Sequence, residues 1–451
     1  MTSSRRVDLI NDPIGPSLRR FATPLAFSFI VNMVYSLIDR FYVSRLGDAA
    51  IAAIGSSDQI VFLLFTLVSG FAVGSGVIVA RRFGEGDRVG ASRTGTQALV
   101  GMAITAVLVS AVMYALLPVI PTVMQMDTTV ETLSMEYLSM LLIGFTFNLM
   151  NFQMFSIVRS TGNAVFPMTV LVITVALNAL IAPFLIFGIG PFPELGMRGA
   201  GLATALSQMS GTAIALTALV RGWTNINLDF TQFRLDIGLL RRVAKQGLPA
   251  SLQMLSVSLN RAAIFAIVAG FGTNVTAAYT LGLNIDMMVF MCVFAMGIAV
   301  ETATGQNLGA RQPERVRMIH RSAITQIGIL MLLLAVVVWL CGTEFVKLYS
   351  QQPETIAEAT QYLNITVIGY VFFSTGLLTV RVLSGAGAAL LAMSITAGSL
   401  LGIQLPLALI LSYGLSMGPL GVWIAIAIGY AIFTLVALVI FRRNRWKAVH
   451  V

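Results

Sequence analysis

The chain has 451 residues, of which 57% are apolar and only 10% are charged. Soluble domains carry about 25% charged residues, so a soluble fold of this composition would expose a largely apolar surface. The net charge of +9 is spread over short segments between long apolar runs. This placement argues against nucleic acid as a partner and indicates that a lipid bilayer surrounds most of the chain.

Long apolar runs separated by polar or Gly/Pro-rich segments predict twelve transmembrane helices. In chain order they lie near 20–43, 58–80, 94–118, 137–158, 166–189, 199–220, 246–270, 277–303, 322–342, 360–383, 388–413 and 419–441. The sequence therefore predicts an all-α integral membrane protein.

Basic residues sort to one side of these spans, which predicts the orientation. With the N-terminus placed in the cytoplasm, most of the 28 Lys and Arg residues fall in cytoplasmic segments or at the adjoining helix ends. Arg261 lies deep within a span, and the outer segments hold only Arg40, Arg45, Arg198 and Lys347. We therefore expect a multi-pass protein, in the inner membrane of a bacterium, with both termini in the cytoplasm.

An internal repeat divides the chain into two halves. The halves coincide at a shift of 225 residues, where Pro24 meets Pro249, Gly84 meets Gly309, Tyr137 meets Tyr362, and Gly162 meets Gly387. Each half contains six spans, so both halves enter the membrane from the same side. Parallel repeats of this kind predict two pseudo-symmetric six-helix lobes with a substrate path near the membrane midplane.

The predicted domains follow from this repeat. The N-terminal lobe covers 1–221, and the C-terminal lobe covers 243–451. The connector 222–242 is amphipathic and mixed in charge, and we interpret it as a cytoplasmic surface linker.

Asp39 is the first candidate functional residue, because an intramembrane carboxylate is costly and usually serves a pathway, a proton relay or a partner. The alternative is that Asp39 is an interfacial charge that reaches the membrane surface close to Arg40. Asn178 either contributes to a cation site or forms a hydrogen bond between helices. Tyr137 either joins that site or, as its repeat partner Tyr362 suggests, belongs to an aromatic belt or has a structural role.

A second pair of intramembrane charges lies in the C-terminal half. Arg261 and Asp286 each lie about nine residues inside the outer ends of adjacent predicted spans, or roughly 14 Å deep. Equal depth predicts an ion pair, which either fixes helix packing or faces a cavity of the C-lobe. Glu301, at the cytoplasmic end of its span, is either a gate residue or loop contact or a residue that takes part in transport chemistry.

Other patterns exclude further functions. Gly70, Gly74 and Gly76 lie within a membrane span, which favours close helix packing over a phosphate-binding loop. No span contains a histidine, a paired acid and base, or a nucleophile beside its base, so an intramembrane enzyme is not expected. Cys292 and Cys341 lack metal-ligand spacing, and neither a metal nor a cofactor is expected.

Several segments, in order and spacing, resemble the multidrug and toxic compound extrusion family, known as MATE. They are "SLIDRFYVSRLGDAAIAAIG", "GVIVARRFGEGDRVGA", "GNAVFPM", "LNALIAPFLIFGIG", "GMRGAGLATALSQ", "KQGLPASLQM" and "VETATGQNLGARQPERV". The resemblance covers nearly the whole chain. It implies twelve helices in two lobes and the export of organic, often cationic compounds driven by inward H+ or Na+.

The resemblance also implies site residues. Asp39, Tyr137 and Asn178 match the cation-site pattern of the N-lobe, whereas Ala182 stands where similar proteins often carry an aspartate. Ala200 stands where they often carry a threonine.

We therefore expect an antiporter that exports small amphipathic organic compounds as a monomer, by alternating access and in exchange for H+ or Na+. A flippase for lipid-linked saccharides or lipids, from the same superfamily, is the alternative. A pyrophosphate-binding cavity in such a flippase would be rich in Arg or Lys, and away from the span ends the sequence supplies only Arg261.

Overall fold

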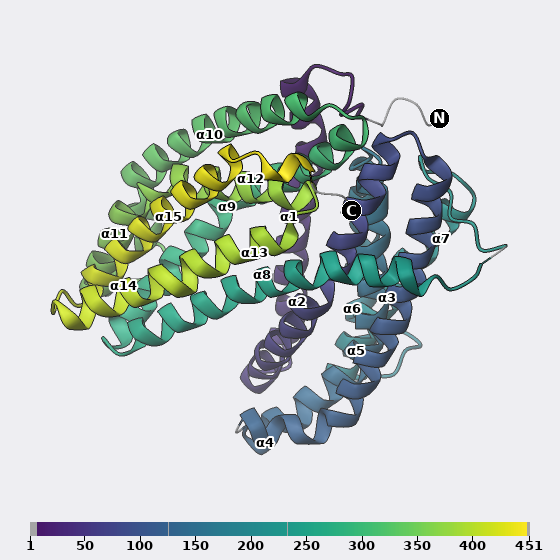
Figure 1. The fold of residues 1–451 in the computed structure, drawn as a ribbon. Helices are drawn as coiled ribbons and strands as arrows, with labels where there is room; N and C mark the ends of the chain where they lie inside the picture. The colour runs from purple at the N-terminus through teal and green to yellow at the C-terminus, as the bar shows by residue number, and fades with distance from the viewer. Residues whose placement is uncertain (1–6, 125, 232, 449–451) are drawn as a thin grey trace. The chain divides into compact units, whose positions relative to one another are not determined.

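The computed structural model describes residues 7–124, 126–231 and 233–448, and every regular element in them is a helix (Figure 1). The chain divides into two compact units, and each is described by itself. The first unit contains Thr23–Ser251, and the second contains Asp8–Ala22 and Leu252–Val451.

Long helices connected by tight turns build the first unit, where α5 packs on α2, α3 and α7, and α6 packs on α7. Their bounds are α1 Ile14–Ser44, which belongs to this unit from Thr23 on, α2 Asp48–Gly84, α3 Arg88–Leu116, α4 Ile120–Met124, α5 Thr128–Arg159, α6 Val165–Phe187 and α7 Gly196–Val220, with a 3₁₀ turn η2 at Leu117–Val119. Side chains of Asp87 and Asp127 cap the N-termini of α3 and α5 by accepting backbone N–H groups.

The second unit has a counterpart for each of these spans, but one of its spans is broken and another contains two π-helical turns. Its helices are α8 Ile237–Ala269, α9 Thr273–Gly309, α10 Pro313–Lys347, α11 Pro353–Thr366, α12 Gly369–Gly385, α13 Ala389–Ser399, α14 Leu405–Leu409 and α15 Pro419–Arg442. Short π-helical turns η3 at Leu400–Gln404 and η4 at Ile410–Gly414 continue α13 and α14, and η5 at Arg445–Ala448 follows α15. The helix α12 packs on α9, α10 and α15.

Eleven helical segments of the described chain are long and apolar enough to cross a membrane. The helices α11 and α12 pass the same test together, although the chain bends by 52° between them. Counted as one broken span, this pair completes the twelve that the sequence predicts. Most helices extend beyond the predicted apolar runs into the polar residues that flank them, whereas α6 ends at Phe187, two residues before its predicted limit.

The division into units differs from the predicted lobes in two places. The stretch Asp8–Ala22 belongs to the second unit, where Asn307 Nδ2 donates to Leu9 O at 2.9 Å and the Arg315 guanidinium donates to Asp12 O. The linker and the first part of α8, up to Ser251, belong to the first unit. Hydrogen bonds from side chains to backbone oxygens leave no signal in the distribution of apolar residues along the sequence.

The close packing predicted for Gly70 and Gly74 is confirmed. A Cβ on Gly70 would lie 2.2 Å from the carbonyl oxygen of Gly247, and one on Gly74 would lie 2.6 Å from the backbone nitrogen of Gly247. Ser251 Oγ accepts the N–H of Gly70 at 3.1 Å and donates to Leu67 O at 2.7 Å. Small residues thus bring the backbones of α2 and α8 into direct contact.

The repeat is also visible in backbone geometry. Gly47 and Gly272, which are 225 residues apart, precede α2 and α9 with φ of 104° and 106°. Gly162 and Gly387, at the same separation, have φ of 87° and 92°. These φ values lie where side chains other than glycine are strained, so the sequence repeat preserves the same turns in both halves.

Candidate functional site

Asp39 lies in α1 with only 7% of its surface exposed. Its Oδ1 atom is fully buried and has no hydrogen-bond partner, and Asp39 forms no ion pair among the described residues. Burial of an unpaired carboxylate is expensive. A buried carboxylate of this kind is tolerated when a bound cation or a proton neutralises its charge.

Two tyrosines on the same face of α1 flank Asp39 and define where it points. Tyr35 lies four residues before Asp39 and Tyr42 three residues after it, so the three side chains share one helix face. The hydroxyl of Tyr35 lies 3.2 Å from Thr204 Oγ1 in α7, and the hydroxyl of Tyr42 donates to Ala179 O in α6 at 3.3 Å. Asp39 therefore faces α6 and α7.

Asn178 is the polar side chain of α6 at this place, and it is 1% exposed. Its Nδ2 donates to Thr204 Oγ1 at 3.4 Å, while its Oδ1 is buried without a partner. Ala182 and Ala200, at the positions where a carboxylate and a hydroxyl were expected, are fully buried. Thr204, one helical turn after Ala200, supplies a hydroxyl in its place.

Tyr137, in α5, is 3% exposed, and its environment includes the charge of Asp39. The alternative of an exposed aromatic belt does not apply to a side chain buried this deeply. Tyr35 and Thr204 connect the helix face of Asp39 to Asn178 in one polar region of the first unit, whereas Tyr137 packs in the apolar core of that unit. Carboxylate, amide and hydroxyl oxygens are ligands that hard cations prefer.

Asp286 is the corresponding buried carboxylate of the second unit, with 4% of its surface exposed. The hydroxyl of Tyr362 donates to its Oδ2 at 2.6 Å, and the hydroxyl of Tyr370 donates to its Oδ1 at 2.6 Å. The predicted ion pair with Arg261 is wrong: among the described residues, no basic group lies within 4 Å of Asp286. Equal depth in the membrane did not determine which way either helix faces.

The bend between α11 and α12 explains how two tyrosines reach one carboxylate. Tyr362 and Tyr370 are eight residues apart, about 12 Å along a straight helix. The 52° bend falls between them, so one hydroxyl comes from each side of the break. Tyr362 also packs edge-on against Tyr279 and Trp423, with ring centroids at 5.6 and 4.9 Å.

Arg261 has no hydrogen bond or ion pair with the described residues, and its side chain is exposed. It lies one residue after Asn260, whose Nδ2 donates to Gln404 Oε1 at 2.9 Å. The structure thus presents an uncompensated guanidinium within a helix that is apolar enough to cross the membrane.

Glu301 forms an ion pair with Arg381, at 2.9 Å from Oε2 to Nη1, and this contact joins α9 to α12. Only 11% of the Glu301 side chain is exposed. The backbones of α9 and α12 approach each other closely at this pair, because a Cβ on Gly385 would lie 2.3 Å from Glu301 O. Repeat alignment offered no hint of this pair, because Glu301 and Arg381 align with Gly76 and Ser156 in the first half.

The sequence analysis did not assign Tyr35 and Thr204 to the region of Asp39, nor Tyr362 and Tyr370 to Asp286. Tyr35 was detectable, because it lies one turn before Asp39 on the same face. Tyr362 was detectable as the repeat partner of Tyr137. Nothing in the sequence indicated Tyr370, because its role depends on the bend between α11 and α12.

Buried polar side chains within membrane spans, broken helices and a duplicated six-span unit define a polytopic membrane transporter. The sequence matches the MatE family over residues 24–184 and 249–410, two segments that begin 225 residues apart. The chain therefore belongs to the MatE family of multidrug and toxic compound extrusion transporters, which are not enzymes.

Named relatives match over almost the full chain. YoeA of Bacillus subtilis (strain 168), a probable multidrug resistance protein, is 27% identical over 425 residues, covering 92% of this chain and 91% of its own. A protein of Shewanella oneidensis named FAD transporter is 25% identical over 381 residues, covering 82% and 84%. The solved structure of a MOP superfamily transporter from Pyrococcus furiosus is 26% identical, with a TM-score of 0.89 over 99% of both chains.

Proposed function

We propose that the protein is a cation-coupled antiporter that exports small amphipathic, often cationic organic compounds in exchange for H+ or Na+. The observation that supports this proposal best is the buried Asp39 Oδ1 atom, which has no partner. An antiporter needs a group that binds a cation in one state and releases it in the other. A carboxylate left uncompensated inside the membrane has this property.

The neighbours of Asp39 suggest what each residue does. Asp39 supplies the single negative charge and accepts either H+ or Na+. Asn178 Oδ1 accepts no hydrogen bond, so it is available to a cation. Thr204 holds the amide of Asn178 in place by accepting a hydrogen bond from its Nδ2. We assign Tyr35 and Tyr137 to positioning, because both are tyrosines near the charge of Asp39.

In the second unit we assign Asp286 to structure rather than to coupling. Both of its oxygens already accept short hydrogen bonds from tyrosine hydroxyls, so the carboxylate is satisfied without a cation. We propose that Glu301 and Arg381 form a cytoplasmic gate contact, by fixing α9 to α12 where these helices end.

Transport by the purified protein in sealed vesicles tests the proposed function. We expect an imposed H+ or Na+ gradient to drive an organic cation in the opposite direction. Absence of any movement of organic compounds under both gradients would contradict the proposal.

An anionic substrate is a second candidate, and Arg261 is the observation that favours it. An exposed, unpaired guanidinium within a span suits a phosphate or carboxylate group of a substrate. One relative is named FAD transporter, and FAD carries phosphates. In the same vesicle assay, transport of FAD that is lost in Arg261→Gln would establish this class instead of the organic cations.

We also propose that the protein functions as a monomer in a bacterial inner membrane, with both termini in the cytoplasm. The terminal residues 1–6 and 449–451 lie outside the described residues. The topology is therefore tested by labelling exposed positions in two loops and near the C-terminus. In a variant with serine at Cys292 and Cys341, we expect Phe192→Cys and Gln351→Cys to react with an impermeant maleimide only from outside. Arg443→Cys should react only after the membrane is opened. The reverse pattern would refute the proposed orientation.

A further inference from the structure

A groove of about 1220 Å³ lies in the first unit, outside the region of Asp39. Residues at the end of α2, the start of α3 and the linker line it, among them Phe83, Arg88, Arg93, Asn227, Phe233 and Arg234. All of these elements meet where membrane spans end. The groove therefore opens at the level where the bilayer changes from hydrocarbon to headgroups.

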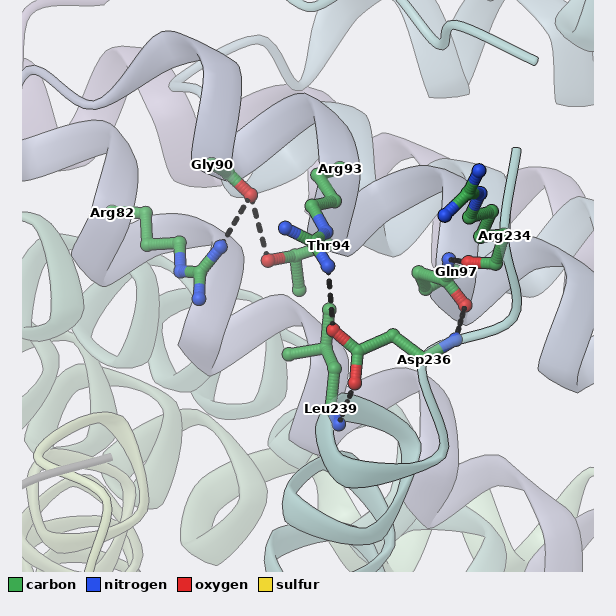
Figure 2. Close-up of polar contacts among 8 residues, drawn as sticks. All are labelled: Arg82, Gly90, Arg93, Thr94, Gln97, Arg234, Asp236 and Leu239. Atoms are coloured by element: carbon green, nitrogen blue, oxygen red, sulfur yellow. Dashed lines mark hydrogen bonds and ion pairs between the residues drawn. The ribbon is translucent and has the colours of Figure 1, made fainter. Parts of the chain in front are cut away.

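Polar contacts hold the linker against α3 and keep the groove open (Figure 2). Gln97 Nε2 donates to Arg234 O at 2.5 Å, and Gln97 Oε1 accepts the N–H of Asp236 at 3.0 Å. Asp236 then forms an ion pair with Arg93 at 2.9 Å and accepts the N–H of Leu239 at the start of α8. The Leu239 N–H, followed by the charge of Arg93, lowers the pKa of Asp236. These contacts fix the linker in place, so the wall of the groove is a defined part of the fold.

The charge of the groove favours an anion. Arg88, Arg93 and Arg234 contribute three positive charges, against two negative charges from Asp229 and from Asp236, which is paired with Arg93. The Asp229 carboxylate is already engaged by the N–H and hydroxyl of Thr231, at 2.8 and 2.6 Å. The guanidinium of Arg234 is exposed and has no partner among the described residues.

Two exposed apolar side chains line the same groove, namely Val89, which is 81% exposed, and Phe233, which is 36% exposed. Trp223, which is 56% exposed, lies in the linker that forms part of the groove wall. Tryptophan and phenylalanine in such positions are typical of segments that lie at the membrane interface. Basic groups beside exposed aromatic groups fit a ligand with an anionic head and an apolar tail.

From these observations we infer that the groove binds the phosphate headgroup of an anionic phospholipid, with Arg88 and Arg234 facing the phosphate and Val89 and Phe233 facing the acyl region. Basic pockets at the cytoplasmic ends of membrane helices are suited to such lipids. The inference is independent of the proposed transport function, because it rests on the linker and not on the residues near Asp39.

Native mass spectrometry of the full-length protein, titrated with phosphatidylglycerol or phosphatidylcholine, tests the inference. We expect one phosphatidylglycerol to bind more tightly than any phosphatidylcholine. Arg234→Gln should weaken this binding about fivefold, because one basic residue near the headgroups is removed. Arg443→Gln, an exposed arginine in the second unit, serves as the matched control and should leave the affinity unchanged.

Three outcomes would overturn the inference. Equal affinity for the two lipids would show that the charge of the groove is not used. Equal effects of Arg234→Gln and Arg443→Gln would show that the lipid binds elsewhere. Competition by millimolar inorganic phosphate as effective as that by phosphatidylglycerol would identify a site for free phosphate instead. Thermal unfolding of each variant excludes loss of the fold, which Arg234→Gln should not affect, because this side chain has no contact to lose.

Discussion

Replacing Asp39 by asparagine is expected to abolish gradient-driven export and to leave the protein folded in the membrane. The asparagine keeps the size of the side chain but neither exchanges a proton nor carries the charge that attracts Na+. Stability should not fall, because the change removes a buried charge that has no partner. Export measured in cells and thermal unfolding measured on the purified variant check both parts of this result.

Asp58→Asn is the matched control for this experiment. Asp58 lies in α2 and forms a 3.4 Å ion pair with Arg40, in which both side chains are well exposed. Exposed pairs of this kind contribute about 0–1 kcal/mol, so we expect Asp58→Asn to keep most of the activity. Full export by Asp39→Asn at every pH would rule out Asp39 as the coupling group.

Replacing Asp286 by alanine is expected to cause the largest loss of stability among the changes considered. The substitution leaves the hydroxyls of Tyr362 and Tyr370 buried without an acceptor, at about 1–3 kcal/mol for each stranded group. It also removes the acceptor that ties both sides of the break between α11 and α12 to α9. A lower unfolding temperature and lower expression in the membrane are the measurements.

A double-mutant cycle identifies the true partner of Asp286. We expect Asp286→Ala and Tyr362→Phe to be non-additive, because each breaks the same hydrogen bond. Asp286→Ala and Arg261→Ala should be close to additive. Tyr279→Phe is the matched control, since this buried tyrosine lies in the same aromatic cluster without a hydrogen bond to Asp286. Additive losses with Tyr362→Phe would contradict the assignment.

Most of the architecture was predictable, because in a bilayer the length and spacing of apolar runs determine where helices cross. The repeat was equally accessible, since turns such as those at Gly47 and Gly272 require the same residue in both halves. The break at 366–369 was not predictable, because no proline marks it and Gly369 aligns with Gly144, which lies inside the unbroken helix α5. Helix rotation was also inaccessible, which is why the depth of Arg261 and Asp286 suggested a pair that the structure does not form.

The site around Asp39 was predictable only in part. The carboxylate is conspicuous because the surrounding span is apolar, and the family resemblance drew attention to Asn178. Thr204 was overlooked because the expected hydroxyl position, Ala200, lies one turn earlier on the same helix. Contacts that depend on a side chain reaching across to another helix, such as Tyr35 to Thr204, become visible only in three dimensions.

The most direct test of the central claim is antiport by the purified wild-type protein in sealed vesicles, with a pH gradient and a Na+ gradient imposed separately. Ethidium, a fluorescent organic cation, reports the movement of substrate. We predict that one of the two gradients drives ethidium against its own concentration gradient, that dissipating the gradient stops this movement, and that Asp39→Asn does not support it. Ethidium transport that is equally fast without any gradient, or the same in Asp39→Asn as in the wild type, would contradict coupling through Asp39.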